Sequence, residues 1–145
     1  MATMGEKKIK GRKRHLLVDT NGLILRVHVH PADEQDRDGG LDLLVGADRE
    51  FPRLEQLWAD GAYQGGFEDW VDQHLGWRVT IVSAPPEQTG FAVQPRRWVV
   101  ERTFAWLGRY RRLAKDFEEL VECVVAHILI ASLHIMLKRL APAAV

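Results

Sequence analysis

The sequence lacks the features that define several protein classes. Cys123 is the only cysteine among 145 residues, which excludes an intrachain disulfide and a cysteine-based zinc site. This fits a reducing, intracellular setting. No apolar segment follows the basic N-terminus, which argues against a signal peptide. The longest apolar stretch, Cys123 to Leu137, contains two histidines and is shorter than the ~20 residues of a membrane span.

The remaining composition is that of an ordinary globular domain, with 46% hydrophobic and 28% charged residues. The net charge of zero hides four blocks. Residues 1–30 carry a net +5, residues 31–72 a net −9, residues 73–115 a net +6 and residues 116–145 a net −2. Two basic blocks around an acidic one favour a polyanion-binding surface. A solvated surface with no partner is the alternative, and composition alone favours it.

Local patterns predict one mixed α/β domain. Strands are expected over 15–19, 23–30 and 77–83, and helices near 41–45 and over 67–75, 96–115 and 118–140. The pair Asn21-Gly22 between the first two strands is the strongest short signal for a hairpin. Segment 54–59 is ambiguous between strand and helix, and 32–40 and 84–95 read as loops. Strands that alternate with helices after a hairpin indicate a mixed sheet with helices on its faces.

Two carboxylates, Asp60 and Glu101, occupy positions that suit a catalytic group. Asp60 follows a short apolar run and precedes Gly61, and catalytic groups in α/β sheets gather at the ends of such strands. A turn aspartate that caps the next helix is an equally good interpretation. Glu101 lies in the helix WVVERTFAWL, at the half-buried margin of the expected apolar stripe. For Glu101, a simple pair with Arg97 one turn earlier is the favoured alternative on spacing alone.

Basic residues gather in two clusters that suit phosphate oxygens. The first lies within 7–14, and the second, interleaved with tryptophan and tyrosine, fills 96–115. The candidate DNA-binding residues are Lys10, Arg12, Lys13, Arg14, Arg97, Arg102, Arg109 and Arg112. His28 and His30 share one face of their strand, but no third metal ligand is evident. We therefore interpret the histidines as core or surface residues.

Four segments carry a family resemblance that spans about residues 10–140. They are KGRKRHLLVDTNGLIL, ADEQDRDGG, FPRLEQLWADGAYQG and QPRRWVVERTFAWLGRYRRLAKDFE. Together they resemble the DDE transposases of bacterial insertion sequences, in the group numbered four/five. The resemblance implies an RNase H-like fold and three carboxylates that hold two divalent ions, Mg²⁺ or Mn²⁺. It matches Asp60 to the second aspartate, Glu101 to the glutamate and Arg97 to an arginine near the DNA.

The implied function is DNA transposition, by metal-dependent strand cleavage and transfer at the ends of an insertion sequence. Two metal ions stabilise the attacking and leaving oxygens of such a displacement. The implied partners are DNA at the element ends and the target, and either the N-terminal transposase portion or another copy of the chain. No membrane partner is expected, and the implied location is the bacterial cytoplasm at the nucleoid.

The sequence departs from the family at its start. The family's first aspartate lies on the opening strand of the sheet, whereas MATMGEKKI contains no aspartate and no strand-like run. We therefore expect a C-terminal portion of a transposase, as a truncated remnant or the second frame of a frameshifted gene. The expected layout is a basic arm over 1–14, a partial RNase H-like domain over 15–140 without its central first strand, and a tail over 141–145.

Two consequences and two alternatives follow. A sheet without its central strand predicts a marginally stable, aggregation-prone chain that is inactive alone, unless Asp19 or Asp33 substitutes as a ligand. The alternative functions are a DNA-binding regulator without catalysis, derived from the element, and a nuclease with the same core. An upstream frame that encodes the missing aspartate would favour the transposase over the regulator.

Overall fold

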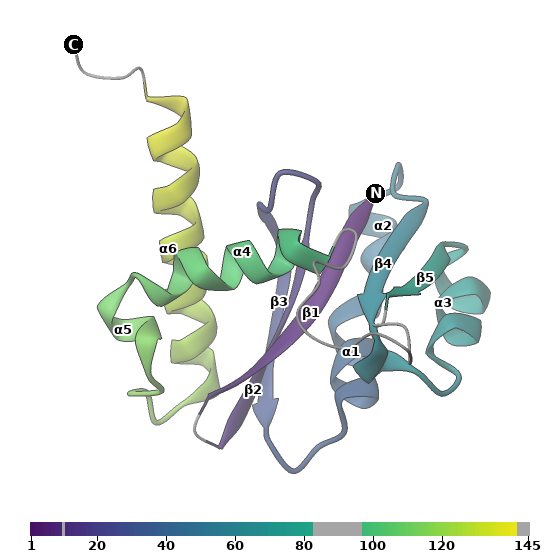
Figure 1. The fold of residues 1–145 in the computed structure, drawn as a ribbon, viewed down its shortest axis with the longest axis horizontal. Helices are drawn as coiled ribbons and strands as arrows, with labels where there is room; N and C mark the ends of the chain where they lie inside the picture. The colour runs from purple at the N-terminus through teal and green to yellow at the C-terminus, as the bar shows by residue number, and fades with distance from the viewer. Residues whose placement is uncertain (10, 83–96, 142–145) are drawn as a thin grey trace, which may run out of the picture.

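The structure, a computed structural model, describes residues 1–9, 11–82 and 97–141. Its strands are β1 (Ala2–Ile9), β2 (Arg12–Val18), β3 (Ile24–Pro31), β4 (Gln56–Asp60) and β5 (Arg78–Val82). Its helices are α1 (Asp36–Leu44), α2 (Ala47–Glu50), the 3₁₀ turn η1 (Gly61–Tyr63), α3 (Phe67–Leu75), α4 (Arg97–Gly108), α5 (Arg111–Ala114) and α6 (Val121–Leu140). Figure 1 shows the sheet between these helices.

The strands form one mixed sheet in the order β3-β2-β1-β4-β5. β3, β2 and β1 are antiparallel, and β1, β4 and β5 are parallel. The predicted hairpin is confirmed between β2 and β3. Asp19 Oδ1 accepts hydrogen bonds from the backbone N–H groups of Asn21 and Leu23, both at 2.9 Å, and Gly22 adopts a positive φ of 81°. This turn chemistry commits Asp19 to the hairpin.

The expectation of a missing central strand is wrong. Residues 2–9 form β1, which pairs with β2 along seven residues and with β4 along three. β1 thus satisfies the backbone groups of β2 and β4 that were expected to lose their ladders. The prediction of a marginal fold loses its physical basis. The expected basic arm over 1–14 is likewise built into the sheet, as β1 and the start of β2.

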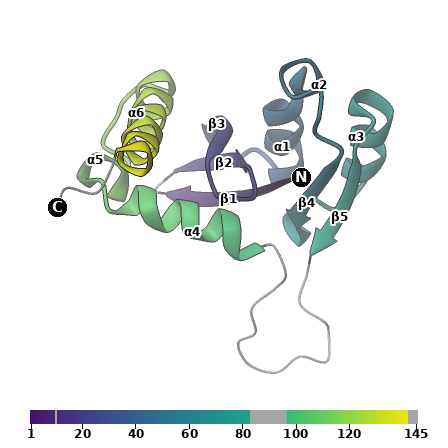
Figure 2. The same cartoon turned by 90° about the horizontal axis from the view of Figure 1, so that it is seen from above.

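Alternation along the strands separates two hydrophobic clusters, one on each face. Met4, Leu17, Leu57 and Ala59 pack with the helices α1 and α3 on one face. Leu16, Val18 and Val29 instead pack with α4 and α6. Figure 2, seen from above, places α4 on the opposite side of the sheet from α1 and α3. The sheet therefore has an α1 face, covered by α1 and α3, and an α4 face, covered by α4 and α6.

Some helix boundaries differ from the predictions. The helix expected over 96–115 ends at Gly108, and α5 follows after the extended residue Tyr110. The acidic segment 32–40, expected as a loop, contains the first half of α1. Two glycines concealed this helix, and both are buried. A Cβ on Gly39 would lie 2.2 Å from His30 Nε2, and one on Gly40 would lie 2.6 Å from the ring of Tyr63. The loop expected over 84–95 lies outside the described residues.

This close approach of α1 to the sheet gives a stability test. We expect Gly39→Ala to lower the free energy of unfolding by about 1–3 kcal/mol, because the added methyl group overlaps two imidazole rings. The matched control is Gly108→Ala, where a Cβ meets nothing within 4 Å. It should be neutral or stabilise by up to ~1 kcal/mol. Urea denaturation compares the two, and equal effects would contradict a packing role for Gly39.

Candidate active site

Asp60 ends β4 and caps the turn that follows. Its Oδ1 accepts a hydrogen bond from the N–H of Ala62 at 2.8 Å, at the start of η1. The capping role that the sequence offered as an alternative is therefore present. Leu57 and Ala59 point to the α1 face, so alternation turns Asp60 toward the α4 face. Its side chain is half-buried at the end of a parallel strand, where α/β sheets place their ligands.

Glu101 lies in the second turn of α4. The buried stripe predicted for this helix is confirmed in Val99, Val100, Thr103, Phe104 and Leu107. Glu101 itself is exposed, whereas its position at the margin of the stripe predicted that it would be half-buried. The buried stripe packs on the sheet, and Glu101 lies about 100° around the helix from the buried Val100. This rotation turns Glu101 away from the sheet and toward solvent. The residue is therefore accessible to solvent.

The two carboxylates belong to elements that meet on one face of the sheet. α4 packs across β1 and β2, and its N-terminal end reaches β4 (Figures 1 and 2). Thr103 fixes the helix to the hairpin, because its hydroxyl donates to Gly22 O at 2.6 Å. The structure thus brings the start of α4 and the end of β4 to the same face. Convergence of the Asp60 and Glu101 side chains onto shared ions stays a prediction.

The neighbour of Asp60 on β1 is a glycine. The β1–β4 ladder ends with Met4 opposite Ala59, so Gly5 is the next residue toward Asp60. Gly5 faces α4, and a Cβ there would lie 2.8 Å from Val100 Cγ1. Thr3, Gly5 and Lys7 are the α4-facing residues of this part of β1, and none is acidic. Within residues 1–9, 11–82 and 97–141, no three His, Cys, Asp or Glu side chains are placed to hold a metal ion.

The acid on β1, Glu6, points to the α1 face. Burial raises its pKa, and the negative charges of Asp36 and Asp60 raise it further, against the opposing effect of Lys13. Lys13 Nζ lies 2.6 Å from Asp36 Oδ1. Glu6 is therefore electrostatically coupled to Asp60 although alternation places the two side chains on opposite faces. The two substitute ligands proposed from sequence do not join Asp60 either, because Asp19 caps the hairpin and Asp33 lies on an exposed loop.

Beneath Asp60, a buried hydrogen-bonded chain joins Tyr63, His15 and His30. His30 Nδ1 donates to Pro31 O at 2.7 Å, because a carbonyl only accepts. With neutral rings, His30 Nε2 then accepts from His15 Nε2 at 2.6 Å, and His15 Nδ1 accepts from Tyr63 OH at 2.7 Å. Period-two spacing put His28 and His30 on one face but gave no sign of this partnership across strands and η1.

Burial in this chain favours the uncharged forms of His15 and Tyr63. His15 is completely buried, and burial, followed by the nearby His30, lowers its pKa from the usual 6.5 to about 3. Burial also raises the pKa of Tyr63 well above its usual value, and the charge of Asp60 adds to the effect. The chain therefore supports the η1 turn through the hydrogen bond from the uncharged Tyr63 to His15. It places no positive charge on the histidine under the Asp60 turn.

The buried histidine predicts a dependence of stability on pH. The folded protein binds a proton at His15 only near pH 3, whereas the unfolded chain binds one near pH 6.5. Stability should therefore fall as the pH decreases from about 6.5 toward 3, by up to ~1.4 kcal/mol per pH unit from this residue. His15→Gln should flatten that slope. Urea denaturation of both proteins at several pH values measures it, and parallel slopes would contradict the assignment.

Most of the expected DNA-binding residues near the N-terminus make internal contacts. Arg12 Nη1 lies 3.3 Å from Asp116 Oδ1 and donates to Glu118 O at 2.8 Å. Lys13 pairs with Asp36, as described above. Arg14 is 3% exposed and donates to Leu113 O at 2.9 Å. These side chains hold the sheet to α1, α5 and the loop after α5, so the proposal that they bind phosphates is no longer favoured.

The second basic cluster is more accessible. Arg109 is exposed at the end of α4, and Arg102 and Arg139 lie over the ring of Trp106 at 4.7 and 4.5 Å. Arg112 pairs with Glu118 instead. Lys10 and the side chain of Arg97 lie outside the part of the chain that the structure describes. Sequence reasoning missed Lys138 and Arg139, which the last turn of α6 places beside Trp106 and Arg109.

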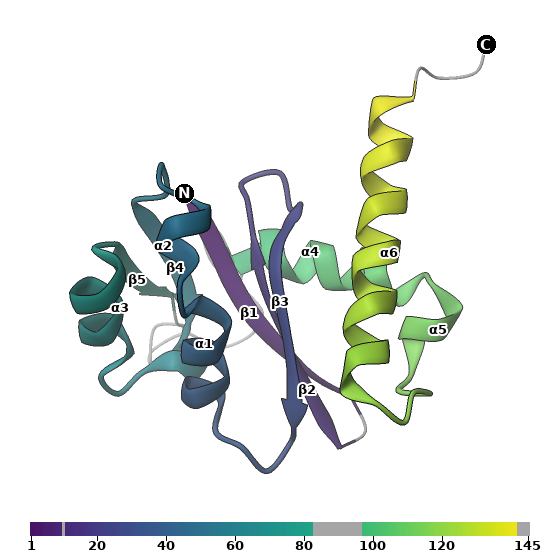
Figure 3. The same cartoon turned by 180° about the vertical axis from the view of Figure 1, so that it is seen from behind.

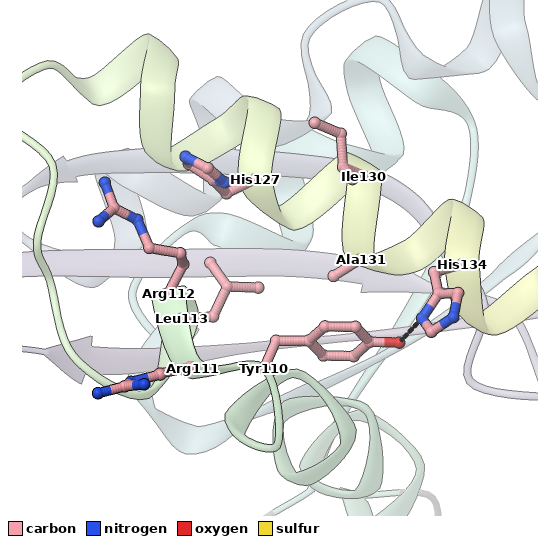
Figure 4. A pocket seen from close by; sticks show the side chains of 8 residues that line it. All are labelled: Tyr110, Arg111, Arg112, Leu113, His127, Ile130, Ala131 and His134. Atoms are coloured by element: carbon pink, nitrogen blue, oxygen red, sulfur yellow. Dashed lines mark hydrogen bonds between the residues drawn. The ribbon is translucent and has the colours of Figure 1, made fainter.

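The adjoining cavity lies between α5 and α6 and is not part of the carboxylate site. Figure 4 shows its lining, in which the Tyr110 hydroxyl and His134 Nδ1 are hydrogen-bonded at 2.7 Å. Its other lining residues are Arg111, Arg112, Leu113, His127, Ile130 and Ala131. The cavity walls thus come from the short helix α5 and one side of α6.

Comparison with known protein families decides the affiliation. Residues 2–136 match the family described as the transposase DDE domain. The chain belongs to that family. It is 32% identical over 117 residues to the transposase of the insertion sequence element IS402 from Burkholderia cepacia, covering 74% of this chain and 54% of the relative. The chain thus spans about half the length of this curated relative.

Solved structures support the same fold. The catalytic core domain of BIV integrase has a TM-score of 0.55 at 18% identity, covering 91% of this chain and 80% of that one. A chain of the simian T-cell lymphotropic virus intasome has a TM-score of 0.57 at 18% identity, covering 90% and 45%. Integrase catalytic cores have the RNase H-like fold. The predicted RNase H-like sheet, flanked by helices, is therefore confirmed.

Proposed function

We propose that this chain acts on DNA in transposition, as the portion of a DDE transposase that carries Asp60 and Glu101. The supporting observation is that the Asp60 strand end and the Glu101 helix meet on the α4 face of an RNase H-like sheet in a member of the DDE family. The proposed partners are DNA and the remaining transposase polypeptide or a further subunit. The similarity to a protein named as the transposase for IS402, an insertion sequence element, supports the element ends as the proposed substrate.

The family generally uses divalent metal ions, and carboxylate oxygens are the ligands that Mg²⁺ prefers. Asp60 and Glu101 fit that chemistry. The position expected for the third carboxylate does not fit that chemistry, because the residue of β1 next to Asp60 is Gly5 and the side chain of Val100 fills the space above it. The residues described here therefore supply an incomplete set of ligands, and we assign this chain alone no cleavage step. Its proposed role is to bind DNA and to contribute two of the acidic groups.

The incomplete ligand set favours a second candidate, a DNA-binding regulator without catalysis. Gly5 is the specific observation behind it. The two candidates differ when a first aspartate is supplied. A transposase portion should give Mg²⁺-dependent cleavage of element-end DNA once a strand that carries this aspartate takes the place of β1 beside β4, and Asp60→Asn should abolish that cleavage. A regulator should bind the DNA equally well and never cleave it.

The donor set makes a direct prediction about metal affinity. Gly5→Asp alone should misfold locally against Val100, so we pair it with Val100→Ala to make room. This double variant should gain Mn²⁺ binding, because a third hard oxygen ligand then faces Asp60. Isothermal titration calorimetry measures the gain. The control replaces Gly5 by asparagine in the same Val100→Ala background, and equal binding by both variants would contradict the placement.

Arg109, Lys138 and Arg139 form the proposed DNA-backbone surface, referred to as the Trp106 patch. Replacing all three by alanine should weaken binding to a DNA duplex and reduce the slope of log K against log salt by about 0.9 for each lost phosphate contact. Fluorescence anisotropy across a salt series measures both quantities. The matched control is Arg78→Ala, an exposed arginine on β5. An unchanged salt slope in the triple variant would count against this surface.

A further inference from the structure

α6 leaves a long apolar face uncovered. Leu129, Ile130, Leu133, Leu137 and Leu140 are between 49% and 81% exposed. At 3.6 residues per turn, these five side chains fall within an arc of about 100° on one side of the helix. The opposite side, with Val124, Ile128 and Ala131, is buried against the sheet. Figures 1 and 3 show the C-terminal half of α6 projecting beyond the sheet. On another side of the helix, Arg139 in its last turn still contacts Trp106 and the β2–β3 turn.

The spacing within this face is that of a helix-pairing seam. From Cys123 the seam continues through Ala126, Ile130, Leu133, Leu137 and Leu140, in steps of three and four residues. Apolar residues in alternating steps of three and four pack knobs into holes on a partner helix. We call these six residues the α6 seam. None of them is charged, and all lie on a helix that packing against the sheet already orders.

Hydrogen-bonding side chains at the edges of the seam favour an identical partner. Glu122 borders one edge and His127 borders the other, five residues further along. When two identical helices pair in parallel, residues with this spacing on opposite edges face each other across the seam. Glu122 of one copy then lies beside His127 of the other, on both sides of the two-fold axis. The other groups near this His127 are Glu118, 3.3 Å away, and Arg112, which pairs with that same Glu118.

Other occupants fit less well. In sequence, the apolar run of 15 residues from Cys123 to Leu137 is too short for a membrane span. In the structure, α6 has 20 residues and is long and apolar enough to span a membrane. Its inner side, however, is committed to the protein core, and Lys138 and Arg139 flank its end. Nucleic acid needs basic groups, and the seam offers none. A pre-ordered apolar helix face also pays little conformational entropy when a second helix binds.

We propose that the α6 seam is a dimer interface, in which α6 of one copy pairs with α6 of a second copy of this chain. The contact is isologous, since each copy contributes the same surface. It lies on a different element from Asp60 and Glu101, and it concerns assembly in the absence of DNA. The proposal therefore stands or fails independently of the proposed function.

Sedimentation velocity of the 145-residue chain without DNA tests this assembly. We expect a species of twice the 16.5 kDa chain mass at high micromolar concentration. Leu133→Glu and Leu137→Glu should each shift it to the monomer, because they place like charges opposite each other in an apolar seam. The matched control is Val45→Glu, at a residue that is 59% exposed outside the seam. Circular dichroism melts confirm that each variant folds.

Cross-linking adds a positional readout. In a Cys123→Ala background, Leu133→Cys should form a disulfide-linked dimer under mild oxidation, whereas Val45→Cys should not. A monomeric wild-type chain at high concentration, or a dimer that survives both glutamate substitutions, would overturn the proposal. Co-sedimentation of the monomeric chain with phosphatidylcholine vesicles would overturn it in favour of a membrane surface.

Discussion

The pairing of β1 with two different strands organises the rest of the molecule. β1 is antiparallel to β2 on one side and parallel to β4 on the other, so it joins the hairpin half of the sheet to the parallel half. Its register also decides what stands beside Asp60. Because the ladder with β4 ends at Met4 opposite Ala59, a glycine faces α4 and the acid of the next residue, Glu6, faces away. A shift by one residue would exchange the two.

The same alternation gives the two faces of the sheet different chemistry. The α4 face carries the carboxylates of Asp60, half-buried, and Glu101, exposed, next to a buried aliphatic stripe. The α1 face carries a hydrogen-bonded chain of imidazole and phenol groups, in which burial keeps His15 and Tyr63 uncharged by shifting their pKa values. Tyr63 links the faces, because it follows Asp60 by three residues in η1 and reaches down to His15. The turn that presents Asp60 on the α4 face is thus supported from the α1 face.

Features that depend on neighbouring residues were predictable from sequence. The Asn21-Gly22 hairpin, the helix over 67–75 and the buried stripe of α4 follow from turn chemistry and helical periodicity, and all three are present. The position of Asp60 at a strand end was also predictable. β1 was not, because residues 2–9 lack the alternating β-branched pattern of a strand. They are ordered by two ladders that no local signal encodes.

The other residues whose roles were wrongly predicted from sequence also make contacts with residues that are distant along the chain. Arg12 and Arg14 resemble DNA-binding residues in sequence. In the structure, each donates a hydrogen bond to a backbone carbonyl group about one hundred residues away along the chain. Gly39 and Gly40 look like a loop, but they let α1 approach two imidazoles and a phenol. In both cases the residue type predicts one role from its local sequence, but its contact with a residue distant in sequence gives it another.

The packing of Val100 connects the candidate site to the fold. Val100 precedes Glu101 on α4, and its methyl groups occupy the space above Gly5. This one side chain therefore determines both the distance of α4 from the sheet and the size of the residue that fits next to Asp60. A larger residue at position 5 would lift the start of α4 and move Glu101 with it. The glycine is therefore part of the packing that positions the glutamate. Any route to a third carboxylate on β1 must change the α4 contact in the same step.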